Sequence, residues 1–186
     1  MDGIYGILPG VSQMTNIHPL FVHFPIALFN SFFVMEFFGV ILKREDRRTA
    51  ATWMLYLGTL GAVGAVSAGL WAASTVSHTE EVHAIMVRHG IFCITVLTLG
   101  VLLSVWRFYV NNKFSIKLHV LHLILAFIML ITMTFGADLG GLMVYKYGVS
   151  VKAVPQPKGH VHGGAIHETQ ESHGDMHMDG EHGHGE

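Results

Sequence analysis

Four long apolar runs, separated by short polar connections, set the pattern of hydrophobic and polar positions along this chain. A bilayer core of ~30 Å needs about 20 consecutive helical residues, and each of the four runs is long enough to span it. The runs predict helices over about 19–42, 51–76, 78–108 and 117–143. Together they make residues 17–151 one transmembrane domain. The predicted fold class is all-α, an integral membrane four-helix bundle.

The composition agrees with this prediction. Hydrophobic residues make up 51% of the chain and charged residues only 13%, against about 25% charged residues in an average soluble domain. Much of the chain therefore cannot face water. We expect membrane lipids as partners, and no nucleic acid.

The distribution of basic residues predicts the orientation, because cytoplasmic connections carry an excess of lysine and arginine. Seven basic residues lie in or beside the connections after the first and third predicted helices: Lys43, Arg44, Arg47, Arg48, Arg107, Lys113 and Lys117. The opposite side has only four. We therefore expect a multi-pass protein of the bacterial inner (cytoplasmic) membrane with both termini in the periplasm.

The composition changes after Gly148, and residues 1–16 and 152–186 stand apart from the predicted bundle. The C-terminal segment is rich in glycine, histidine and acids and has almost no large apolar side chains, so we expect a disordered tail. Histidine-rich tracts bind ions such as Zn, Ni or Cu(II). The candidate ligands are the seven histidines of the tail: His160, His162, His167, His173, His177, His182 and His184.

Two histidines are expected inside the membrane near its outer face. His23 lies about one turn into the first predicted helix, and His89 lies at a similar depth in the third. Two imidazoles at matched depth can ligate one b-type haem from opposite faces. A small-metal site or a purely structural pair are the alternatives. His18 is interpreted as a residue before the helix that could cover the site.

A second polar group is expected near the inner face. Glu36 is the only acidic residue inside the first predicted helix, and His119 and His122 of the fourth helix lie at about its depth. A contact with either histidine would offset the cost of a buried acid. The group is interpreted first as a structural pair and second as a proton relay.

The segments HPLFVHFPIAL, VRHGIF and GGLMVYKYGVSV resemble a widespread family of bacterial four-helix inner-membrane proteins, which is catalogued as a domain of unknown function. The resemblance covers roughly residues 17–151. It singles out His18, Pro19, His23, Pro25, Glu36, His89, Arg107, Gly140, Gly141, Val144, Tyr145, Gly148 and Val151. It implies the four-helix fold but no activity.

Three functions are therefore open. The first is a haem b protein that passes electrons near the periplasmic face, as a subunit of a membrane redox complex. The second is binding or transport of transition metals, and the third is a scaffold subunit without a cofactor. The single Cys93 and the absence of a Cys-x-x-Cys-His motif exclude covalent attachment of a c-type haem. An electron-transfer or binding subunit is favoured over a stand-alone enzyme.

Overall fold

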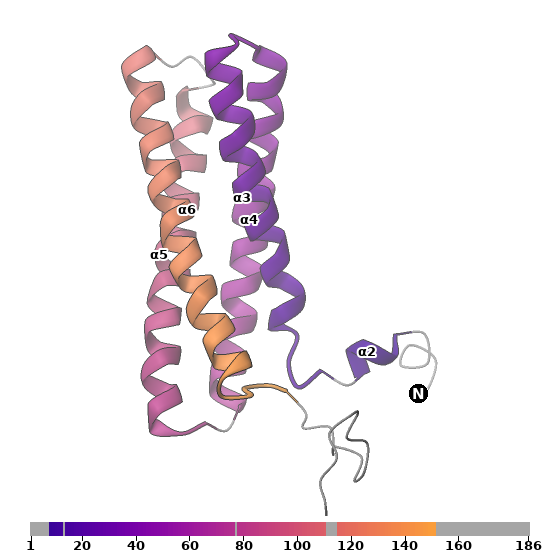
Figure 1. Cartoon of the computed structure of the whole chain (residues 1–186). Coiled ribbons are helices and arrows are strands. Elements are labelled where there is room, and N and C mark those ends of the chain that lie inside the picture. Colours follow the sequence, from indigo (N-terminus) through magenta and orange to yellow (C-terminus); the bar gives the residue numbers. More distant parts are fainter. Residues whose placement is uncertain (1–7, 13, 77, 111–114, 152–186) are drawn as a thin grey trace, which may run out of the picture. The chain divides into compact units, whose positions relative to one another are not determined.

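Four long helices and one short helix make up the described part of the chain (Figure 1). The computed structural model describes residues 8–12, 14–76, 78–110 and 115–151. The helices are α2 (Pro9–Ser12), α3 (His18–Ile41), α4 (Glu45–Thr75), α5 (Glu80–Val110) and α6 (Ile116–Tyr145). No strand occurs among these residues, so the prediction of an all-α four-helix bundle is confirmed.

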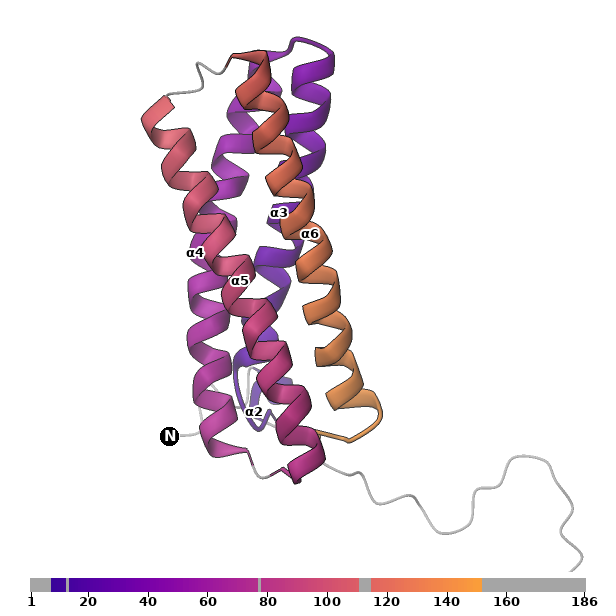
Figure 2. The same ribbon diagram turned by 90° about the vertical axis from the view of Figure 1, so that its left-hand side faces the viewer.

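The long helices form two hairpins, α3 with α4 and α5 with α6, which pack against each other (Figures 1 and 2). Around the bundle each helix contacts the next one in the chain, and α6 closes the ring against α3. We call the end where α3 starts the histidine end, because it holds His18 and His89. The opposite end, with the connections after α3 and after α5, is called the charged end.

The surface of the bundle is apolar on all sides, as expected for helices in lipid. All four long helices are long and apolar enough to cross a membrane. Their outward faces carry large apolar side chains, among them Phe24, Trp53, Leu60, Ile91 and Phe135. The chain is thus a membrane protein with four candidate spans.

The helix boundaries differ from the expected ones where polar residues begin a helix. Helix α4 starts at Glu45 instead of near residue 51, and its first turn is charged. Acidic residues there suit the positive end of the helix dipole. Helix α5 starts at Glu80, where the Val82 amide donates to Thr79 Oγ1 at 3.4 Å. Apolar runs mark the middle of a helix, so they locate such ends poorly.

Glycines bring α3 and α4 close together. A Cβ atom at Gly58 would lie 2.9 Å from the ring of Phe29, and one at Gly61 would lie 3.2 Å from Phe24 Cβ. Small residues at such positions allow close backbone approach between membrane helices. The close packing fixes the rotation of α3 against α4, which determines where the histidines of α3 point.

Candidate functional site

Two imidazoles face each other at the histidine end. The rings of His18 on α3 and His89 on α5 have centroids 6.2 Å apart and are nearly perpendicular, at 89°. His18 Nδ1 lies 2.9 Å from the carbonyl oxygen of Ala65 on α4, and His89 Nδ1 lies 2.8 Å from that of Gly136 on α6. Each ring is therefore held by the partner helix of its own hairpin.

A glycine makes room for each of these rings. A Cβ atom at Gly69 would lie 3.0 Å from the His18 ring, and one at Gly140 would lie 3.3 Å from the His89 ring. In both cases the glycine stands four residues after the carbonyl that the histidine contacts. That carbonyl belongs to the turn directly beneath the glycine. The missing side chain lets the imidazole reach it.

The hydrogen bonds fix the tautomer of both histidines. A carbonyl oxygen can only accept, so Nδ1 of each ring must carry the proton and donate it. In the neutral ring Nε2 then has the lone pair, which is the arrangement found in histidines that ligate metals. Cys93 Sγ, a soft donor atom, lies 3.4 Å from His89 Nε2. The atoms that the two rings can offer to a ligand are therefore their Nε2 nitrogens.

His23 does not take part in this arrangement, contrary to the expected pairing with His89. Its side chain is exposed, and its Nδ1 lies 2.8 Å from the carbonyl oxygen of Pro19 in its own helix. Helix α3 begins at His18 itself, so His18 is not a residue preceding the helix. Five residues of helix turn His23 about 140° away from His18. The ring that faces His89 is that of His18.

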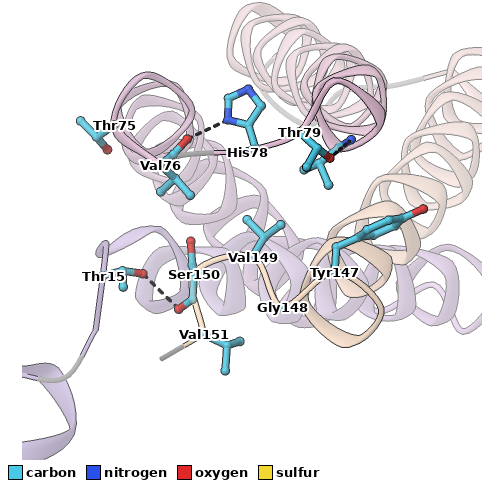
Figure 3. Close-up of a pocket in the computed structure, with 11 residues that line it drawn as sticks. Thr15, Thr75, Val76, His78, Thr79, Tyr147, Gly148, Val149, Ser150 and Val151 are labelled. Carbon is cyan, nitrogen blue, oxygen red and sulfur yellow. Dashed lines mark hydrogen bonds between the residues drawn. The ribbon is translucent and has the colours of Figure 1, made fainter. Parts of the chain in front are cut away.

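The loop after α6 packs against the segment that precedes His18. Asn16 Nδ2 donates to Ser150 Oγ at 2.7 Å, and Asn16 Oδ1 accepts from the His18 amide at 3.1 Å. Thr15 Oγ1 donates to the Ser150 carbonyl at 3.0 Å (Figure 3). The two most specific sequence motifs, around His18 and in the loop, thus meet at the histidine end.

The same loop borders a pocket whose other wall is the connection between α4 and α5 (Figure 3). Two further histidines lie at this connection. The rings of His78 and His83 stack with centroids 5.3 Å apart, and His78 Nε2 lies 3.0 Å from His83 Nδ1. Both are exposed, so this pair lies outside the bundle core.

A buried ion pair occupies the charged end. Arg107 Nη2 on α5 lies 2.7 Å from Glu36 Oε2 on α3, and both side chains are 0% exposed. Arg107 Nε donates to Thr52 Oγ1 at 2.8 Å, and its Nη2 also donates to the carbonyl of Arg48 at 3.0 Å. A buried carboxylate needs such a partner, because an isolated charge in a medium of low dielectric is very costly.

Of the two histidines weighed as partners of Glu36, His119 makes the contact. Its Nε2 lies 3.3 Å from Glu36 Oε1 and 2.9 Å from Arg48 Nη2. A guanidinium only donates hydrogen bonds, so Nε2 of His119 must accept, and the ring is neutral. His122 is fully buried against the rings of Phe32 and Trp106.

The main partner of Glu36 is thus Arg107, whereas the sequence predicted a histidine as its partner. Arg107 entered the sequence analysis only through the family resemblance and as a basic residue near a connection. Its signal was the helical phase, because Arg107 is four residues after Leu103 and seven after Gly100, so it lies on the buried face of α5. An arginine on the buried face of a spanning helix predicts a buried acid nearby.

Among the described residues no group of three or more histidine, cysteine, aspartate or glutamate side chains could hold a metal ion. The candidate ligands of the tail, His160 to His184, lie outside the described residues. The expected disorder of residues 152–186 lies outside them as well.

These features define a class: integral membrane four-helix bundles with a polar pair at each end of the core. The family model described as "Predicted membrane protein (DUF2231)" matches residues 14–153, and the chain belongs to this family. The resemblance to an uncharacterised membrane family is therefore confirmed. No curated protein and no solved structure matches the chain.

Proposed function

We propose that this membrane domain binds one b-type haem between His18 and His89 and passes electrons as a subunit of a membrane redox complex. The observation that carries the proposal is the pair of facing imidazoles, each tied to a carbonyl through Nδ1. Two imidazoles that bind one metal through Nε2 at ~2 Å each have ring centroids roughly 6 Å apart. The separation here is 6.2 Å.

The surroundings of the pair also fit this function. Gly69 and Gly140 border the two rings, and in the described part of the chain no charged side chain hydrogen-bonds to either imidazole. Two neutral axial histidines held by backbone carbonyls give a fixed ligand geometry, which is what rapid electron exchange at a haem iron requires. Residues of this chain then supply ligands and orientation, while the haem supplies the redox chemistry.

We further propose that the histidine end faces the periplasm of a bacterial inner membrane. The charged end carries Lys43, Arg44 and Arg47, which the positive-inside rule assigns to the cytoplasm. A reporter that is active only in the periplasm should be active when fused after Gly148 and inactive when fused after Lys43. The opposite pattern would place the histidine pair on the cytoplasmic side.

A second candidate function is binding of a small transition-metal ion at the same place. Cys93 Sγ at 3.4 Å from His89 Nε2 favours it, because a neighbouring imidazole nitrogen and sulfur are donor atoms that zinc and copper accept. In this case Cys93 is a ligand, whereas the haem proposal does not use it. The two functions therefore differ in their dependence on Cys93.

The test is an absorption spectrum of the detergent-purified protein, as isolated and after incubation with haem. The haem proposal expects a Soret band with sharp α and β bands on reduction, lost in His18→Ala and in His89→Ala and kept in Cys93→Ser. His23→Ala is the matched control, since His23 lies on the same helix but is exposed. A protein that stays colourless after reconstitution overturns the proposal.

The metal count separates the remaining functions. A chain shortened after Pro155 lacks the histidines of the tail. One metal ion per chain that remains bound to this shortened protein must therefore be held by the bundle. Binding that depends on Cys93, His18 and His89 supports the second candidate. We expect the full chain to bind additional Ni or Zn weakly through the tail. A bundle that binds neither haem nor metal is a scaffold subunit.

A further inference from the structure

Three polar pairs that face each other in the bundle are separated by the same number of residues. Glu36 meets Arg107, and Arg48 meets His119, each pair 71 residues apart in the sequence. His18 meets His89 at the same separation. In every pair the residues come from helices at opposite corners of the bundle, either α3 and α5 or α4 and α6.

An apolar contact follows the same rule. Phe29 of α3 packs where a Cβ atom of Gly100 in α5 would lie, with Phe29 Cζ 3.0 Å from that position. These two residues are again 71 positions apart. Four levels of the bundle core, from the histidine end to the charged end, are therefore built by pairs with one offset.

The same offset of 71 residues relates the starts of α4 and α6 and the backbone carbonyls that the two histidines contact. Helix α4 starts at Glu45 and α6 at Ile116. His18 and His89 each contact a carbonyl 47 residues further along the chain, and each rests on a glycine four residues beyond that carbonyl. The sequence itself shows the repeat only faintly, because the aligned positions of α4 and α6 share few residues besides Gly69 and Gly140.

The buried positions agree with the same offset. Pro25, Phe29, Phe32 and Glu36 of α3 correspond to the buried residues Val96, Gly100, Leu103 and Arg107 of α5. Arg48, Ala51, Leu55, Gly58 and Ala65 of α4 correspond to the buried residues His119, His122, Ala126, Met129 and Gly136 of α6. Helical periodicity alone gives each helix one buried face, but it does not give two helix pairs and their polar contacts one common offset.

Contacts between equivalent residues are the mark of a two-fold axis, because a residue on the axis meets its own counterpart. Helices α3 and α5 run in the same direction, so the axis lies along the bundle, as in membrane proteins built from parallel repeats. We propose that the domain is an internal duplication of a two-helix hairpin, and that Glu36 and Arg107 determine that each hairpin pairs with the other and not with a copy of itself.

The charges explain this choice of partner. Two copies of the α3–α4 hairpin paired about the same axis would bring two Glu36 carboxylates together, and two copies of the α5–α6 hairpin would bring two Arg107 guanidiniums together. Like charges in a buried contact are strongly unfavourable, which is a common device for excluding wrong partners. Phe29 and Gly100 add a steric preference, because two phenylalanines would collide and two glycines would leave a void.

The test is to express the chain as two fragments, residues 1–77 with helices α3 and α4 and residues 78–186 with helices α5 and α6, in one membrane with different tags. We expect the two fragments to copurify as a heterodimer in large excess over either homodimer. Glu36→Arg in the first fragment should weaken its pairing with the second fragment by roughly 100-fold or more, and Arg107→Glu in the second fragment should restore it. Lys43→Glu, an exposed charge reversal at the same end, is the control and should leave pairing unchanged.

The intact chain provides a second measurement that does not depend on fragments. Glu36→Arg and Arg107→Glu should each lower the thermal midpoint of the purified protein, whereas the double variant should recover most of the loss. Homodimers that form as readily as heterodimers, or a double variant as unstable as the single ones, would overturn the proposal. Neither measurement uses haem, so this proposal and the proposed function can fail independently.

Discussion

At both ends of the bundle, equivalent positions of the two hairpins face each other, but the residues at these positions differ in kind between the histidine end and the charged end. At the histidine end the equivalent residues are identical, namely His18 and His89. At the charged end they are opposite in charge, Glu36 and Arg107, and satisfy each other. A buried pair of opposite charges has a structural role, because each charge neutralises the other. The two imidazoles bond to backbone carbonyls instead of to each other, and the proposed function places a ligand between them.

The difference also appears in burial. Glu36 and Arg107 are fully shielded, while His18 and His89 are half-buried. Charges that are buried in a membrane protein must be paired within the protein, since neither lipid nor water can solvate them there. Substitutions should therefore act mainly on stability at the charged end and mainly on ligand binding at the histidine end.

The largest effect is expected from Arg107→Met, which leaves the Glu36 carboxylate buried without its partner. We expect a loss of about 3–5 kcal/mol in the free energy of unfolding, the usual cost of breaking a buried ion pair. The double variant Glu36→Gln with Arg107→Met should be much less damaged, because no buried charge is left. Unfolding in mixed micelles with increasing denaturing detergent measures both. Equal losses in the single and double variants would contradict the account of the charged end.

Overpacking beside Arg48 should give the next largest effect. A Cβ atom at Gly39 would lie 2.7 Å from Arg48 Cγ and 3.3 Å from its backbone nitrogen, so Gly39→Ala must displace α4 near its first turn. We expect a loss of about 1–3 kcal/mol, measured by the same unfolding assay. Gly141→Ala is the control, because a Cβ atom there makes only ordinary contacts, the nearest at 3.8 Å. A tolerated Gly39→Ala would mean that the charged end repacks easily.

Substitution of the glycines beneath the histidines should affect haem binding more than stability. Gly69→Ala would place a Cβ atom 3.0 Å from the His18 ring, and Gly140→Ala would place one 3.3 Å from the His89 ring. Each should cost about 1 kcal/mol or less in unfolding, but should weaken haem binding by turning the imidazole. The tighter contact predicts the larger loss for Gly69→Ala. Gly90→Ala, with open space around it, should change neither quantity. Unchanged haem affinity in Gly69→Ala would separate the glycine from the site.

Apolar runs were sufficient to predict the four spans and the fold class, because lipid imposes length and composition on every spanning helix. They did not predict which histidine faces inward. His18 and His23 differ by their rotation around α3, which depends on where the helix starts and on how Phe24 and Phe29 pack on the glycines of α4. Depth can be counted along a sequence, whereas rotation is fixed by packing against another helix.

The partner of Glu36 shows the same limit. The sequence placed an acid and two histidines at one depth, and His119 does contact Glu36, but the ion pair is made by Arg107 from a third helix. Basic residues near a connection were interpreted as orientation signals, which is their commonest role in membrane proteins. The internal repeat would have paired Glu36 with Arg107 directly. The repeat is hidden in the sequence because the two hairpins share the positions of their buried residues but few residue identities.

The last effect concerns the loop that joins the two sequence motifs at the histidine end. Ser150→Ala removes the hydroxyl that accepts from Asn16 Nδ2, and Asn16 in turn accepts from the His18 amide. We expect a loss of about 0.5–1.5 kcal/mol in unfolding, the net value of one hydrogen bond, and a modest loss of haem affinity through His18.

Ser150 also adopts a positive φ of 63°, a conformation that glycine reaches without strain. Ser150→Gly loses the same hydroxyl but relieves the backbone, so its loss in unfolding should be smaller than that of Ser150→Ala. Both variants should weaken haem binding to a similar degree, because the contact with Asn16 is absent from both. If haem affinity instead follows stability across the two variants, Asn16 does not position His18, and the loop acts only by holding the end of the bundle together.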